Sequence, residues 1–350
     1  LKFTGGTGDI TFADTAPVFT PGDNFNTVLY TGNGGTQAIT GTGFQPDLTW
    51  VKSRTNTLSH QLHDSVRGAG YGLLSNNTTA QVFYNTITSF DSNGFTVDAN
   101  SYTGTNASGQ DFVAWSWKAG GAARINTNGT ITSQVSANVD AGFSIVKYTG
   151  TLTSAGNISV GHGLSSAPEL IISKRTDSTG PWRIRPFFLN NNPYDYLEFD
   201  TGALAQLNAS DGTMSLPTST TFDNNWNSAL GSAGDVIAYC FHSVAGYSKI
   251  GSYSGGSTNT IVTGFEPAFL MVKKTNASGT GWYMFDNARN TSNPRDLTLF
   301  ANSSVAEAVE GSYYQPSFLS NGFSFPFANG SGVNISGGEY IFMAFATNPT

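Results

Sequence analysis

The sequence predicts an all-β protein made of three tandem antiparallel β-sandwich modules with very little helix. An aromatic strand recurs three times, at residues 110–118, 234–242 and 338–346. A strand that begins near a proline precedes each copy, at residues 43–52, 166–174 and 264–273. Because the two strands recur as a pair at similar separations, the repeating unit is a module of about a hundred residues.

The aromatic strand, here called the closing strand, is predicted to be buried on both faces. Alternate side chains of a strand share a face. In the first copy Val113, Trp115 and Trp117 form a large apolar face, and Ala114 and Ser116 form a small one. The other two copies have the same large face, at Ile237, Tyr239 and Phe241 and at Ile341, Met343 and Phe345. Apolar residues on both faces are typical of a strand between two packed layers.

Composition agrees with this fold class and excludes some functions. Only 11% of the 350 residues are charged, whereas 41 are Gly and 25 are Phe, which favours strands and turns over helices. The formal net charge of −7, without a visible basic cluster, argues against a nucleic-acid partner. No apolar run is long enough to span a membrane, so membrane insertion is not expected. Cys240 is the single cysteine and is predicted to be a free, buried thiol on the small face of its strand.

Taken in order, the chain divides into five segments. Residues 1–24 are predicted to be an extended leader, because Gly and Pro interrupt any regular element. Module 1 covers residues 25–121, and a Gly/Asn/Ser-rich connector with one candidate strand at 130–135 covers residues 122–141. Module 2 covers residues 142–245 and module 3 covers residues 246–350. The short join at 244–247 implies that modules 2 and 3 are in close contact.

The middle of each module differs most between copies. Asp64 and Arg67 in module 1 recur as Asp286 and Arg289 in module 3, and each Asp is predicted to cap its own turn and pair with its Arg. The capping-box sequence at residues 304–307 suggests a helix of one or two turns. Asn-Gly at residues 93–94 and 321–322 predicts two hairpins, whereas module 2 has a different turn.

Repeated charges suggest a further pairing. A lysine ends each proline-led strand, and a carboxylate starts each closing strand. If these strands are antiparallel neighbours, a lysine–carboxylate pair is predicted at the same corner of each module. The alternative is that each lysine extends independently to water. The residues concerned are Lys52, Lys174 and Lys273, with Asp111, Asp235 and Glu339.

No residue is assigned a catalytic, cofactor-binding or metal-binding role, and ligand-binding residues remain unassigned. His60 and His63 have an H-x-x-H spacing, but on a strand they face opposite sides, so a shared metal ion is not expected. His162, in a Gly-flanked turn, is interpreted as structural or exposed. Six aromatic residues are candidates for stacking on sugars, although core packing is favoured for the two tryptophans: Trp182, Tyr194, Tyr196, Trp282, Tyr313 and Tyr314.

Over residues 25–350 the chain resembles repeat-built structural proteins of marine bacteriophages, often labelled tail-fibre or virion proteins. The resemblance rests on FNTVLYTGNG (25–34), GFQPD (43–47), WSWKAG (115–120), GFSIVKYTG (142–150), VGHG (160–163), AYCF (238–241) and VAGYSK (244–249). It implies jelly-roll or lectin-like sandwiches in a virion component. The family brings no established catalytic residues.

The expected function is therefore that of a non-enzymatic structural protein of the virion surface or fibre, contributing to host attachment. Expected partners are other virion proteins, further copies of this chain, in a homo-oligomer for which a trimer is favoured, and a host-surface glycan. Two alternatives remain open: a carbohydrate-binding adhesin, and a polysaccharide-degrading tailspike with two carboxylates flanking a cleft.

Overall fold

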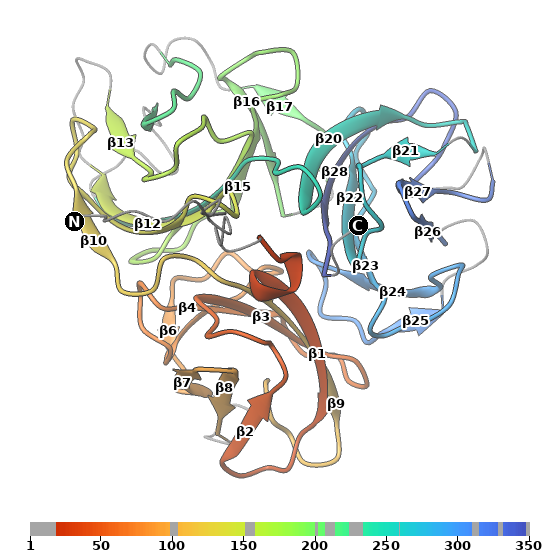
Figure 1. Cartoon of the computed structure of the whole chain (residues 1–350), viewed down its shortest axis with the longest axis horizontal. Coiled ribbons are helices and arrows are strands. Elements are labelled where there is room, and N and C mark those ends of the chain that lie inside the picture. Colours follow the sequence, from red (N-terminus) through yellow and green to blue (C-terminus); the bar gives the residue numbers. More distant parts are fainter. Residues whose placement is uncertain are drawn as a thin grey trace, which may run out of the picture.

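The computed structural model describes residues 19–98, 104–150, 158–199, 202–206, 214–223, 234–258, 260–309, 315–327 and 332–347. Within these ranges the protein is all-β and antiparallel, and the one helical element is the 3-10 helix η1 (Pro21–Asp23). The predicted fold class is confirmed. Each module is a large sheet covered by a small one. Figure 1 shows the three modules as lobes around a common centre.

Module 1 has a six-stranded and a three-stranded sheet. The large sheet contains, in spatial order, β1 (Phe25–Thr31), β9 (Asp111–Trp117), β3 (Leu48–Ser53), β4 (Gln61–Asp64), β5 (Tyr71–Leu73) and β6 (Val82–Phe83). The small sheet contains β2 (Gln37–Thr40), β8 (Gly94–Val97) and β7 (Ile87–Asp91). The closing strand β9 thus lies between β1 and β3, away from both edges.

Module 3 repeats this order. Its large sheet contains β20 (Ser248–Ser254), β28 (Glu339–Phe345), β22 (Phe269–Lys274), β23 (Trp282–Asp286), β24 (Leu297–Phe300) and β25 (Ala308–Val309). Its small sheet contains β21 (Ile261–Val262), β27 (Gly322–Ser324) and β26 (Ser317–Leu319). Both predicted Asn-Gly hairpins are confirmed, as β7–β8 and β26–β27.

Module 2 has the same central order with two additional strands. Its large sheet contains β10 (Arg124–Asn126), β11 (Ser133–Asn138), β12 (Phe143–Gly150), β19 (Gly234–Phe241), β14 (Leu170–Arg175), β15 (Arg183–Pro186), β16 (Asp195–Glu198) and β17 (Ala205–Gln206). The strands β13 (Ser159–Gly161) and β18 (Thr221–Asp223) pair separately. Residues 122–141 are therefore more than a connector, because β11 pairs along β12 and extends this sheet.

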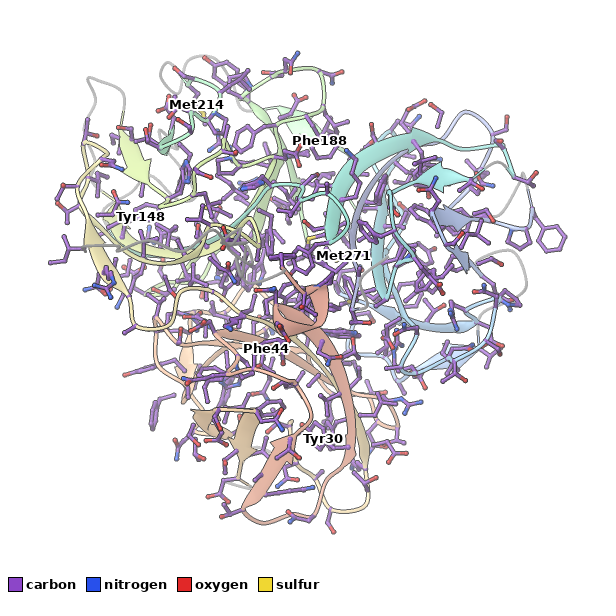
Figure 2. All side chains as sticks on the ribbon, viewed as in Figure 1. Tyr30, Phe44, Tyr148, Phe188, Met214 and Met271 are labelled. Atoms are coloured by element: carbon purple, nitrogen blue, oxygen red, sulfur yellow. The ribbon has the colours of Figure 1, made fainter. Side chains whose placement is uncertain are left out.

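The three large sheets turn their aromatic faces toward one another and share a single core. Trp115 and Trp117 of β9, Tyr239 and Phe241 of β19, and Phe345 of β28 all belong to this central cluster. Figure 2 labels Met271, which belongs to the cluster, near the middle, and Phe188, which packs against the cluster, between the two upper lobes. The three modules are therefore sandwiches that do not stand alone, because their large apolar faces are buried between modules.

A smaller core lies inside each module, between its large sheet and the strands that cover it. Module 1 buries Phe112 and Ala114 of β9 against Phe95 of β8. Cys240 belongs to the corresponding core of module 2 and is fully buried, as predicted. The closing strands are thus buried on both faces, one face in the central core and one in a module core.

The sequence-based prediction for residues 304–307 is wrong, because this segment forms no helix. The carboxylate of Glu307 instead contacts two arginines. The predicted leader, residues 1–24, lies outside the described residues up to residue 18. Its described part, residues 19–24, contains η1. The ring of Phe19 packs edge-on against that of Tyr247, with ring centroids 5.3 Å apart.

Candidate functional site

The contacts between modules follow one repeated pattern. We call the contact between two modules a seam and number it by the modules that meet. In seam 1–2 the Gln81 amide donates to the Thr176 carbonyl, at 3.0 Å. In seam 2–3 the Leu204 amide donates to the Thr275 backbone carbonyl, at 2.7 Å. In seam 3–1 the Glu307 amide donates to the Arg54 backbone carbonyl, at 2.8 Å. The three acceptor residues, Thr176, Thr275 and Arg54, occupy equivalent positions, because each directly follows the proline-led strand of its module. The backbone amide of each also donates a hydrogen bond to a carbonyl at the start of a closing strand, that of Asp235, Glu339 or Asp111. The modules therefore meet with approximate threefold symmetry.

Seam 1–2 contains a buried carboxylate that joins two modules. Asp64 accepts hydrogen bonds from the Arg67 amide, at 2.8 Å, and from Arg67 Nε, at 2.5 Å. Its Oδ2 also accepts a hydrogen bond from the Tyr239 hydroxyl of module 2, at 2.8 Å. Burial raises the pKa of Tyr239 well above its usual value, and the nearby Asp64 adds to this effect. The predicted Asp–Arg turn is confirmed, and it also holds the neighbouring module.

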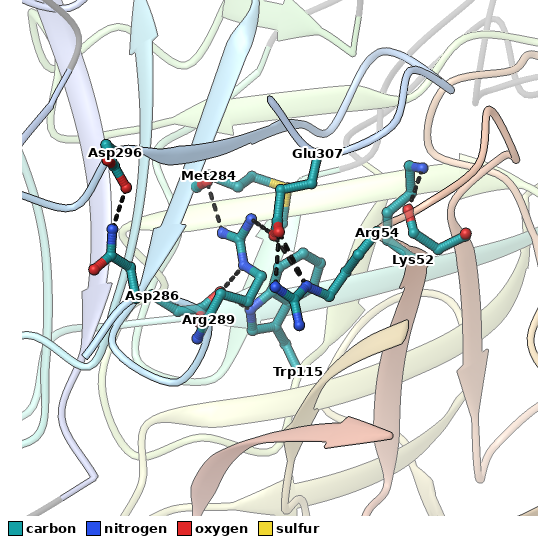
Figure 3. A network of polar contacts seen from close by, with 10 residues as sticks. Lys52, Arg54, Trp115, Met284, Asp286, Arg289, Asp296 and Glu307 are labelled. Carbon is teal, nitrogen blue, oxygen red and sulfur yellow. Dashed lines mark hydrogen bonds and ion pairs between the residues drawn. The ribbon is translucent and has the colours of Figure 1, made fainter. Parts of the chain in front are cut away.

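Seam 3–1 has the same arrangement with more charge (Figure 3). Asp286 binds Arg289 as Asp64 binds Arg67, and its Oδ2 accepts a hydrogen bond from Trp115 Nε1 of module 1, at 3.0 Å. Glu307 lies between two arginines, 3.0 Å from Arg289 Nη1 and 2.7 Å from Arg54 Nη2. Since Arg54 belongs to module 1, this chain of ion pairs connects the last module to the first.

Seam 2–3 is apolar at the equivalent positions. The register places Pro186 opposite Leu170, where modules 1 and 3 have Asp64 and Asp286. Met343 stands where the other closing strands have Trp115 and Tyr239. The acceptor and the donor are thus both replaced, which leaves no buried polar group unsatisfied by the exchange.

The predicted lysine–carboxylate pairs are wrong in modules 1 and 2. Lys52 Nζ donates to the Ser53 carbonyl at 2.6 Å, and Lys174 Nζ donates to Thr78 and Arg175 carbonyls, both at 3.1 Å. No ion pair joins either lysine to the acid of its closing strand in the described part of the chain. Burial lowers the pKa of Lys52 to about 8 and that of Lys174 to about 8. The alternative, extension to water, is also wrong for these two, because both are buried.

The carboxylates that start the closing strands have a different repeated partner. Asp111 accepts a hydrogen bond from the Thr31 hydroxyl at 2.8 Å, and Asp235 accepts one from Thr149 at 2.7 Å. Glu339 accepts one from Ser254 at 3.1 Å. The hydroxyl comes each time from the strand that pairs with the closing strand on the side away from the lysine, namely β1, β12 or β20.

The histidines singled out by the sequence are structural. His60 Nδ1 accepts a hydrogen bond from Trp50 Nε1, at 2.8 Å, whereas the His63 ring contacts Gln61 and the Ala69 carbonyl. His162 is buried, and its Nδ1 accepts the Leu164 amide hydrogen at 3.1 Å. Burial lowers the pKa of His162 to about 4. Among the described residues, no group of three or more His, Cys, Asp or Glu has the geometry to hold a metal ion.

Of the aromatic candidates, Trp182 and Trp282 are each 2% exposed and belong to the central core, which confirms the packing interpretation. Their indole N–H groups also connect modules. Trp182 donates to the Leu74 backbone carbonyl at 2.8 Å, and Trp282 donates to the Glu198 backbone carbonyl at 2.9 Å. Tyr194 and Tyr196 are half-buried. Residues 313 and 314 lie outside the described residues.

Among the described residues, hollows lie where modules meet. A cleft of about 660 Å³ between η1, module 1 and β11 is lined by Asp23, Gln45, Lys118, Asn138 and Asp140, among others. A second hollow, of about 360 Å³, takes residues from all three modules, and we call it the three-module cavity. Its lining includes Asn76 and Asn77 of module 1, Trp182, Glu198 and Phe199 of module 2, and Asn302 of module 3.

Sequence reasoning did not single out the asparagines of this cavity or the Arg54–Glu307 contact. Asn76 and Asn302 occupy similar places: the Oδ1 of Asn76 accepts the His60 amide hydrogen at 3.1 Å, and that of Asn302 accepts the Trp282 amide hydrogen at 2.9 Å. Both asparagines follow the strand next to the large-sheet edge. Aligning modules 1 and 3 through this strand would have paired them, but the variable middle region hid the equivalence.

A family model described as a domain of unknown function (DUF7483) matches residues 20–349. The chain belongs to this family. No curated protein and no solved structure matches the chain. No helix among the described residues is long and apolar enough to cross a membrane.

Proposed function

We propose that this chain is a non-enzymatic structural protein on the surface of a bacteriophage particle, of the tail-fibre kind, that contributes to host attachment. The observation that carries the proposal is the closed arrangement of three modules around one core. It gives one body whose three modules are related by approximate threefold symmetry within a single chain, and we expect copies of this body to assemble into a homotrimeric fibre. The sequence resemblance over residues 25–350 supports the same role.

The use of buried charge agrees with a structural role. Asp64, Asp286 and Glu307 each contact a partner in another module, so their carboxylates are committed to holding the modules together. Removing one partner of such a buried pair is strongly destabilising. A particle component that must keep its shape outside the cell gains from contacts of this kind.

Mass spectrometry of purified phage particles that carry the gene tests the particle location. We expect peptides of this chain at a stoichiometry of several copies per particle, and antibody labelling at the particle surface. Absence of the chain from particles that retain their other structural proteins would contradict the proposal. Analytical ultracentrifugation tests the expected self-association, since a homotrimer has three times the 36.9 kDa mass of one chain.

A second candidate function is carbohydrate binding, and the three-module cavity favours it. The amide side chains in its lining, on Asn76, Asn77 and Asn302, are groups that hydrogen-bond the hydroxyls of a ligand. An array of host-surface glycans tests this function. Binding without release of reducing ends is expected, whereas release of reducing ends would indicate a polysaccharide-degrading tailspike.

A further inference from the structure

We propose that two copies of this chain pair edge to edge through β1, in an antiparallel contact whose twofold axis passes through Leu29. The partner is a second copy of the chain, and main-chain groups make the contact. The inference deepens the self-association that is part of the proposed function and rests on that function for its role. A twofold contact is distinct from the homotrimer expected there, because it joins one chain of a trimer to a chain of another.

The outer edge of the first central strand is covered differently in the three modules. The strands β1, β12 and β20 are equivalent, because each pairs with the closing strand of its module in the same register. In module 2, β11 pairs along the outer edge of β12. In module 3, Ser248 exchanges main-chain hydrogen bonds with Val244, and Ser243 Oγ accepts the Ile250 amide hydrogen at 3.0 Å. In module 1 no described strand lies beyond β1. An uncovered edge strand is a template for pairing with another chain.

The hydrogen-bond register determines which main-chain groups face this edge. The Asn24 carbonyl and the Gly32 amide, at the two ends of β1, both bond to residues that flank β9. Bonded and non-bonded positions alternate along an antiparallel pair. The even-numbered residues of β1 therefore bond to β9, and the main-chain groups of Thr27, Leu29 and Thr31 point away from it.

Some of these outward groups already have partners. Asn26 Oδ1 accepts the Thr27 amide hydrogen at 2.9 Å, and Gln37 Nε2 donates to the Thr31 carbonyl at 3.3 Å. The other outward groups have no hydrogen-bond partner among the residues that the structure describes. These are the Thr27 carbonyl, the amide and carbonyl of Leu29, and the Thr31 amide.

This set of groups is complementary to itself about Leu29. When Leu29 lies opposite Leu29 of a second copy, the two leucines exchange both hydrogen bonds, and Thr27 lies opposite Thr31. The Thr31 amide then donates to the Thr27 carbonyl of the other copy. The other bond of that pair would need the Thr27 amide and the Thr31 carbonyl, which are the two groups that Asn26 and Gln37 already occupy. Every outward group of the three residues is thus satisfied, and neither existing contact is broken.

The side chain of Leu29 favours the same contact. It is 37% exposed, whereas the equivalent residues of the other modules are the polar Lys147 and Ser252. Opposite residues of a bonded antiparallel pair have Cα atoms about 5.5 Å apart, so the two leucine side chains would meet and be shielded from water. Exposed sheet edges commonly carry charged residues that prevent pairing. Module 1 instead has an aliphatic residue where its edge is uncovered.

A cysteine cross-link tests the geometry. Leu29→Cys places two thiols opposite each other, at a Cα separation of about 5.5 Å that a disulfide can span. The native Cys240 is buried and does not compete. Ser252→Cys is the matched control, at the equivalent position of β20. With oxidised glutathione, we expect Leu29→Cys to give a disulfide-linked dimer of twice the 36.9 kDa chain mass on a non-reducing gel. Its yield should exceed that of the control at least about tenfold. Equal yields in the two variants, or no dimer in either, would overturn the inference.

Leu29→Lys tests the association without a covalent bond. Two lysines directly opposite each other repel, so we expect this variant to weaken dimerisation, measured by sedimentation over a range of concentrations, at least about tenfold. Ser252→Lys should change it less than about twofold. Thermal unfolding verifies that both variants are folded. Dimerisation of Leu29→Lys equal to that of the parent would also refute the contact. Trimer mass and particle incorporation are measured separately, so failure of this contact is distinguishable from failure of the proposed function.

Discussion

Asp64 and Asp286 each satisfy their buried carboxylate with donors from two modules. The arginine three residues later supplies an amide and a guanidinium hydrogen, and the neighbouring module supplies a tyrosine or tryptophan hydrogen. Where the chain has Pro186 instead, the residue equivalent to the tyrosine and the tryptophan is Met343, whose side chain has no hydrogen to donate. Exchange of acceptor and donor together is the pattern expected if an unpaired buried polar group is costly.

Replacement of Asp64 by alanine is therefore predicted to destabilise the whole protein. The change leaves the Arg67 guanidinium buried without its carboxylate and removes the acceptor of Tyr239. We expect a loss of about 3–5 kcal/mol in the free energy of unfolding, measured with urea. Asp111→Ala is the control and should cost about 0–1 kcal/mol, because its hydrogen bond to Thr31 is exposed. Equal losses in both variants would contradict the assignment.

His162 is predicted to make stability depend on acidic pH. Burial holds its pKa at about 4 in the folded protein, against the ordinary value of 6.5. Between these values the unfolded chain binds the additional proton, so this contribution is fully present above about pH 6.5 and is lost as the pH falls toward 4.

The variant His162→Asn removes the titrating group and keeps an acceptor for the Leu164 amide. Urea unfolding between pH 4.5 and 7 should show a shallower dependence in the variant, by up to about 1.4 kcal/mol per pH unit. Parallel pH profiles for the two proteins would show that His162 does not contribute.

At the scale of elements, the closing strand organises each module. It pairs on both sides, and its two faces belong to two different cores. The hairpin β7–β8 then brings the small sheet over the closing strand. Its turn glycine, Gly94, has a φ of 151°, and a Cβ there would lie 1.9 Å from the Ile39 carbonyl oxygen.

Gly94→Ala is accordingly predicted to destabilise module 1. The added methyl group meets backbone of β2, which cannot move without breaking the small sheet. We expect a loss of at least about 2 kcal/mol in the free energy of unfolding, measured by denaturant titration. Gly35→Ala is the matched control, since a Cβ at Gly35 has its nearest neighbour at 3.8 Å. The prediction fails if the two variants are equally stable.

Much of this element structure was predictable from the sequence. Strand periodicity and the triple repeat identified the closing strands, and Asn-Gly identified two hairpins. The alternation of side chains along a strand also placed Lys52 and Asp111 on one face. It could not reveal that the Asp111 carboxylate accepts its hydrogen bond from Thr31, on the strand at the other side of β9. The candidate strand at residues 130–135 overlaps β11, but β10 and the pairing of β11 with β12 were missed, because a Gly/Asn/Ser-rich composition resembles that of a linker. The cavity residues come from segments without periodicity, so no pattern connected them.

At the scale of the whole molecule, the large apolar faces show why the modules are interdependent. Each face was recognisable in the sequence, but whether it meets a layer of its own module or another module was not. Phe25 of module 1 stacks on Phe345 of module 3, with ring centroids 5.1 Å apart, and Phe241 of module 2 meets the same ring edge-on at 6.1 Å. No module can keep its aromatic face from water alone.

The protein is therefore predicted to unfold in one cooperative transition. Calorimetry should give a calorimetric enthalpy equal to the van't Hoff enthalpy, as for a single domain. The isolated fragment of residues 246–350 should fail to fold, because Met271, Trp282 and Phe345 would be exposed. Three resolved transitions, or a stable isolated fragment, would contradict the shared core.

The closed arrangement of modules also separates the order of the chain from the order of the fold. A Cβ on Gly22 would lie 2.6 Å from the Thr347 carbonyl oxygen, so the two ends of the described structure adjoin. A circular permutant that joins these ends through a short glycine linker and opens the chain between the exposed residues Ala122 and Ala123 should fold, with a melting temperature close to that of the parent. The order of the three modules along the chain can then be permuted cyclically, and every contact between modules is kept.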